Sequence, residues 1–60
     1  MPVVKIDMWV GRTPEQKKEL IEAITTAFER QGTRSEDLHI IISDISRENW
    51  GTRGKPATEL

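Results

Sequence analysis

The pattern that most constrains the fold is one helix placed between two strand-like runs. Residues 13–16 are typical of a helix start: Thr13 can cap, Pro14 suits the first helical position, and Gln16 completes a capping box. Apolar residues then recur at three- and four-residue spacing: Leu20, Ile21, Ala23, Ile24, Ala27 and Phe28. Gly32 supplies a stop signal, so the sequence predicts an amphipathic helix over residues 14–31. Such a helix needs an apolar surface on which to pack, and the flanking runs must supply it.

Both flanking runs are typical of β-strands. Residues 3–10 alternate in polarity, and their apolar face consists of Val4, Ile6, Met8 and Val10. Residues 38–45 are rich in β-branched side chains, and Leu38, Ile40 and Ile42 can join that face beneath the helix. Strands joined by a helical crossover of this length are parallel, and the crossover is right-handed. We therefore predict an α+β fold: one β-α-β unit with parallel strands, then a short hairpin or turn in residues 49–54.

The second face of the predicted sheet has no element of the chain to cover it. This face carries Val3, Trp9, Ile41 and Ile45. A two-stranded sheet with a bare apolar face is not stable alone in water. A chain of 60 residues buries only about 60% of the surface that its unfolded form exposes, and the lack of cysteine leaves no disulfide to compensate. We therefore expect a homo-oligomer.

Charge and hydropathy exclude several classes of function. The net charge is −1, and the 9 basic and 10 acidic residues are interspersed, so we expect no nucleic-acid partner. No run approaches the roughly 20 apolar residues of a membrane span, and the start lacks the order of a signal peptide, so we expect no membrane partner and a cytoplasmic location. The single histidine, His39, cannot hold a metal unaided, so no metal site is predicted.

The first two residues, Met1-Pro2, suggest a proton-transfer group on the backbone itself. If Met1 is excised, Pro2 becomes a free secondary amine at the head of a strand. Such an amine has one lone pair and sits in a rigid ring, so no side-chain rotamer must be fixed before it acts. A retained Met1 converts the same nitrogen into a tertiary amide without a basic lone pair.

Four features occur in an order that resembles a known family. They are Pro2 opening a strand, Gly11-Arg12-Thr13 leading into the helix, the Ile-rich second strand, and Asn49-Trp50-Gly51 before Gly54. Together they are similar to the 4-oxalocrotonate tautomerases, and the resemblance covers residues 1–60 as a single tautomerase-like domain. It implies a cofactor-free isomerase that interconverts the enol and keto forms of a small 2-oxo or 2-hydroxy-dienoic acid. It also implies a homohexamer, built as a trimer of dimers, with sites at subunit boundaries.

The resemblance also implies roles for individual residues. Pro2 is the general base, and an apolar pocket with a nearby cation lowers the pKa of its amine. Arg12 is catalytic: it binds a substrate carboxylate or carbonyl oxygen and stabilises enolate charge, because its planar fork suits carboxylates. Trp50 walls the pocket, where the family usually has Phe. Trp9 matches an apolar wall position, and simple subunit packing remains its alternative role.

His39 departs from the family pattern. The prototype carries a second arginine here that grips the substrate across a subunit boundary, and an imidazole is a shorter and weaker carboxylate anchor. Either the substrate has one carboxylate, or a tail arginine, Arg47 or Arg53, replaces the missing group. We keep His39 as a candidate substrate-binding residue, with a structural interface histidine as the alternative.

Two other functions fit the same resemblance. A haloacrylate dehalogenase of this superfamily would use a protonated Pro2 and a carboxylate that activates water, and the second strand end offers Asp44 or Glu48. A non-catalytic oligomeric module would keep the fold and lose the chemistry, as the change at His39 suggests. Halide release supports the first, and efficient tautomerisation excludes the second.

Overall fold

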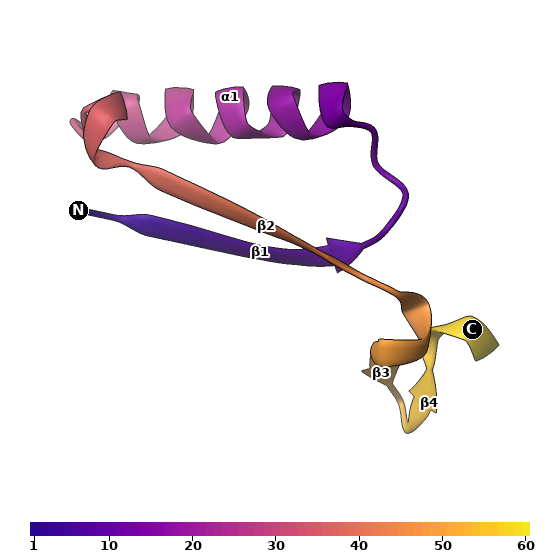
Figure 1. The fold of residues 1–60 in the computed structure, drawn as a ribbon. Helices are drawn as coiled ribbons and strands as arrows, with labels where there is room; N and C mark the ends of the chain where they lie inside the picture. The colour runs from indigo at the N-terminus through magenta and orange to yellow at the C-terminus, as the bar shows by residue number, and fades with distance from the viewer.

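The computed structural model describes all 60 residues and contains the predicted β-α-β unit (Figure 1). In chain order its elements are β1 (Val3–Trp9), α1 (Pro14–Arg30), η1 (Ser35–Asp37), β2 (His39–Ile45), η2 (Arg47–Asn49), β3 (Gly51–Thr52), β4 (Lys55–Pro56) and η3 (Ala57–Glu59). β1 and β2 pair in parallel, with Val3 opposite His39 and Trp9 opposite Ile45. α1 lies along one face of this strand pair, as the amphipathic pattern predicts.

Both ends of α1 follow from local sequence. The Thr13 hydroxyl accepts a hydrogen bond from the Gln16 amide (3.1 Å), and the Gln16 side-chain oxygen accepts one from the Thr13 amide (2.9 Å). This is the predicted capping box. At the other end the Thr33 amide donates to the Phe28 carbonyl (3.1 Å), around a left-handed Gly32 (φ 93°). Glycine closes the helix in this conformation because it has no Cβ to strain.

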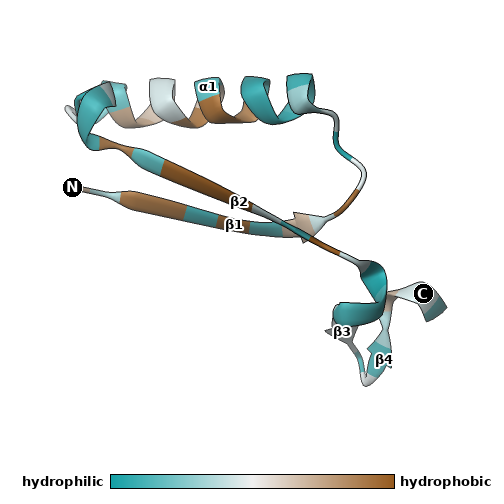
Figure 2. Cartoon of the chain, viewed as in Figure 1, coloured by the Kyte–Doolittle hydropathy of each residue, from teal (hydrophilic) through white to brown (hydrophobic).

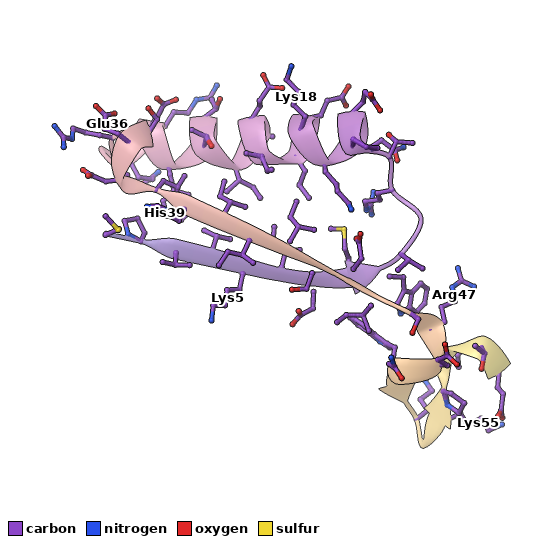
Figure 3. All side chains as sticks on the ribbon, viewed as in Figure 1. Lys5, Lys18, Glu36, His39, Arg47 and Lys55 are labelled. Atoms are coloured by element: carbon purple, nitrogen blue, oxygen red, sulfur yellow. The ribbon has the colours of Figure 1, made fainter.

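Apolar side chains line the face of the strands beneath α1, and the strands are hydrophobic along much of their length (Figure 2). Val4, Ile6 and Met8 of β1 are half-buried together with Ile40 and Ile42 of β2. In Figure 3, Lys5 points away from the helix, as the alternation predicts.

The prediction for Val10 is wrong. Val10 was expected on the covered face, but β1 ends at Trp9 and Val10 is 53% exposed. The Val10 amide still donates to the Ile45 carbonyl (3.1 Å). The chain then turns away from the sheet at Gly11 and leads into α1; Gly11 has φ 127°, a conformation that glycine adopts readily.

The other sheet face is largely uncovered, as predicted. Val3 and Ile41 on this face are 50% and 47% exposed, and Ala57, at 2% exposure, is the one buried residue of the chain. The expectation that nothing in the chain covers this face fails at one end, because Trp9 is half-buried against Trp50 of the tail. The single chain therefore has very little interior of its own, which is the condition in which small domains rely on association.

The tail forms the predicted hairpin. β3 and β4 pair antiparallel, and the two residues between them, Arg53 and Gly54, both have positive φ (56° and 79°). Two consecutive left-handed residues are characteristic of the type I′ turn, whose twist matches that of paired strands. The hairpin lies beyond the carboxyl end of β2 (Figure 1). No helix of the chain has the length and apolar character needed to cross a membrane.

Candidate active site

Pro2 is held at the amino end of the sheet by its carbonyl group. The carbonyl oxygen accepts a hydrogen bond from the His39 amide at 3.1 Å, which continues the β1–β2 ladder by one residue. Proline has no N–H, so the Pro2 nitrogen takes no part in this ladder. Pro2 is half-buried, whereas Met1, which acylates its nitrogen, is 83% exposed. Pro2 and His39 are therefore neighbours, joined through the backbone.

Arg12, Trp9 and Trp50 lie at the opposite end of the sheet. The rings of Trp9 and Trp50 meet edge to face, with centroids 5.9 Å apart and planes at 79°. Arg12 follows β1 in the connection to α1, is exposed, and makes neither an ion pair nor a side-chain hydrogen bond. This end of the sheet thus presents an aromatic surface and a free guanidinium.

The candidate residues form two groups that one chain does not bring together. β1 has seven residues, and at about 3.3 Å per residue it separates its two ends by about 20 Å. Trp9 and His39 belong to the same sheet face but lie at opposite ends of it. Figure 3 shows His39 and Arg47 at these two ends. A site that contains both groups therefore needs more than one chain.

The sequence offered Arg47 only as one of two tail arginines that replace the family's second arginine. Its guanidinium carbon lies 4.7 Å from the centroid of the Trp9 ring. Arg53, the other tail arginine considered, lies in the turn between β3 and β4. The Trp9 indole N–H is buried without a hydrogen-bond acceptor. The signal available in the sequence was weak: Arg47 stands three residues before Trp50, and its contact with Trp9 joins two residues that are far apart in the sequence.

The carboxylates that a dehalogenase requires are not gathered beside Pro2 within the chain. Asp44 forms an ion pair with Lys17 of α1, on the helix side of the sheet. Glu48 lies in η2, at the end of the sheet that is remote from Pro2. No group of three or more His, Asp or Glu residues is placed to hold a metal ion.

The whole chain matches one family of known proteins. Residues 2–59 match the model of the tautomerase enzyme family. A 2-hydroxymuconate tautomerase from Comamonas testosteroni is 44% identical over 61 aligned positions, covering 100% of this chain and 97% of the relative.

Solved structures agree with this match. A 4-oxalocrotonate tautomerase isozyme from Methylibium petroleiphilum superposes with a TM-score of 0.86 at 40% identity, covering 95% of this chain and 94% of that one. A heterohexameric 4-oxalocrotonate tautomerase from Chloroflexus aurantiacus gives a TM-score of 0.89 at 30% identity, covering 100% and 98%.

The chain therefore belongs to the tautomerase family. It is an isomerase that interconverts tautomers, and the predicted family, fold class and tautomerase activity are confirmed. The dehalogenase and the non-catalytic module are not favoured, because the relatives that cover the chain end to end are tautomerases.

Proposed function

We propose that Pro2, once Met1 is removed, is the proton-transfer group of this tautomerase. The observation that supports this most directly is the hydrogen bond from the His39 amide, which holds Pro2 by its carbonyl and leaves the ring nitrogen out of the ladder. In a 2-hydroxy-dienoate, the neutral amine accepts the hydroxyl proton while the electrons move along the diene. The resulting ammonium returns that proton to carbon, so the ketone forms and the enzyme is regenerated.

Arg12 and the two tryptophans complete this proposal. The Arg12 guanidinium has no counterion in the chain, so it is free to bind a substrate carboxylate and to stabilise enolate charge. Trp9 and Trp50 form the apolar wall. An apolar wall that excludes water and a nearby cation both disfavour the ammonium form, so both lower the pKa of the Pro2 amine. His39, the neighbour of Pro2 in the strand pair, lies at the edge of the proposed site.

The site is composite in this proposal, with Pro2 from one subunit and Arg12, Trp9 and Trp50 from another. The separation of about 20 Å along β1 supports this, because one chain cannot bring these groups together. The exposed Val3 and Ile41 supply apolar surface for association. We propose a homohexamer arranged as a trimer of dimers; the Chloroflexus relative is a hexamer of mixed chains.

The substrate proposed is a small 2-hydroxy-dienoic acid. A relative 44% identical over the full length is named for 2-hydroxymuconate, which is a 2-hydroxy-dienoate with two carboxylates. Arginine guanidinium groups then bind the substrate carboxylates, and the reaction needs no group beyond the Pro2 amine to carry the proton.

The test compares one chain with two different amino termini. A protein tagged at its carboxyl end, shown by intact mass to begin at Pro2, should ketonise 2-hydroxymuconate. The same chain with one residue retained before Pro2 should keep its sedimentation coefficient and lose the activity, because the amine has become an amide. Equal activity of the two forms would falsify the role of Pro2.

A further inference from the structure

Arg47 belongs to a small cluster that the proposed chemistry does not yet use. Its guanidinium lies 4.7 Å from the centre of the Trp9 ring, and Trp9 in turn contacts Trp50 with ring centres 5.9 Å apart. Trp9 ends β1, Arg47 opens η2 and Trp50 directly follows η2. We call Trp9, Arg47 and Trp50 the tryptophan–arginine cluster.

The positive charge of Arg47 has no carboxylate partner. The two ion pairs of the chain join Lys17 to Asp44 and Arg34 to Asp37. Stacking over an aromatic ring engages the flat face of a guanidinium and leaves its N–H edges free to donate. A side chain already held by such stacking loses less rotamer freedom when it binds a ligand. The Arg47 guanidinium is thus held in place and has N–H groups free to donate hydrogen bonds to a carboxylate.

The other cations are less suited to this task. The His39 imidazole is a shorter and weaker carboxylate anchor than a guanidinium, and Arg34 is already paired with Asp37. Arg53 lies in the turn between β3 and β4, where no aromatic ring is stacked against it. Arg47 lies beside the tryptophans at the carboxyl end of the strands, the end at which Arg12 follows β1.

We propose that Arg47 binds a second carboxylate of the substrate and makes this tautomerase prefer dicarboxylic over monocarboxylic enols. The inference rests on the proposed function, since it needs Arg12 and the tryptophans to face the substrate. The Arg47 fork donates hydrogen bonds to one carboxylate, while Arg12 binds the other end of the molecule or its enolate oxygen. Trp9 acts as a positioning residue, because it holds the Arg47 side chain by its ring.

The experiment uses two substrates that differ by one carboxylate: 2-hydroxymuconate and 2-hydroxypenta-2,4-dienoate. Arg47→Ala should lower kcat/KM for the dicarboxylate by about tenfold to hundredfold, mainly through KM, as expected for a lost charged hydrogen bond. The monocarboxylate should change by less than about threefold. Arg47→Gln keeps part of the stem over Trp9 and should show the same discrimination. Arg53→Ala, in the turn between β3 and β4, is the matched control and should leave kcat/KM unchanged for both substrates.

The outcomes separate this inference from the function on which it rests. An equal loss on both substrates in Arg47→Gln, with the assembly intact, would show that Arg47 only supports the fold, and no loss on either would show that it has no role. Both results overturn the inference while leaving Pro2 as the base. Failure of the proposed function is distinct, because the unsubstituted protein beginning at Pro2 would then convert neither substrate.

Discussion

The His39 amide donates a hydrogen bond to the Pro2 carbonyl at 3.1 Å. Pro2 lies one residue before Val3, which forms the first residue pair of the β1–β2 ladder with His39. This bond ties the first residue after Met1 to the central strand pair, although chain termini are commonly frayed. It also depends on main-chain atoms alone. The position of residue 2 is therefore insensitive to its side chain, which makes substitution at this place a clean test of chemistry.

Pro2→Ala should abolish most ketonisation and leave the assembly in place. The alanine carbonyl can accept the same hydrogen bond from His39, whereas the rigid secondary amine is replaced by a primary amine. A positioned general base typically contributes about 10²–10⁴-fold, so we expect kcat to fall by about a hundredfold or more. Steady-state kinetics together with sedimentation measure the two effects. Wild-type turnover in the variant would rule out Pro2 as the base.

Arg12→Ala should weaken substrate binding without weakening the fold. Arg12 is exposed and makes no ion pair or side-chain hydrogen bond, so the free energy of unfolding should change by less than about 0.5 kcal/mol. Loss of a charged hydrogen bond to a carboxylate costs about 1.5–3 kcal/mol, or about a tenfold to hundredfold fall in kcat/KM.

Lys18→Ala on the exposed face of α1 is the control for loss of one surface positive charge. Its kcat/KM should equal that of the unsubstituted protein. An equal fall in both variants would mean that the charge of the surface, rather than a contact from Arg12, governs substrate binding.

Trp50→Ala should reduce both stability and activity, and Trp50→Phe should restore most of each. The Trp50 ring meets Trp9 edge to face, and such aromatic pairs contribute about 0.5–1.5 kcal/mol beyond their buried area. The Trp50 carbonyl accepts from the Ala57 amide at 2.7 Å, and this main-chain bond survives in both variants. Thermal unfolding and kcat measure the change. If Trp50→Phe were as impaired as Trp50→Ala, the apolar wall would not be what the ring supplies.

The β-α-β unit was predictable because its signals are local. The capping box at Thr13 and Gln16, the stop at Gly32 and the alternation in residues 3–10 each act within a few positions. The prediction for Val10 was wrong because alternation describes a strand but not where the strand ends, and the turn at Gly11 leaves Val10 exposed.

The candidate site was less predictable because its contacts are not local. Trp9 and Arg47 are far apart in the chain, and their 4.7 Å contact depends on how the tail folds back past the end of β1. The separation of Pro2 from Arg12 along β1 follows from strand length alone. How two subunits would bring them together in the proposed site is a property of an assembly, which the pattern of one chain does not encode.

Arg53→Asn should stabilise the protein without changing its activity. Arg53 has φ 56° in the turn between β3 and β4, a conformation that costs an ordinary L-residue energy and that asparagine adopts readily. We expect a gain of about 0.5–1 kcal/mol per chain, or a rise of a few degrees in Tm at fixed protein concentration. Arg53→Ala removes the same charge without favouring positive φ, so its Tm should not rise. Equal shifts in the two variants would assign the effect to charge rather than to the turn.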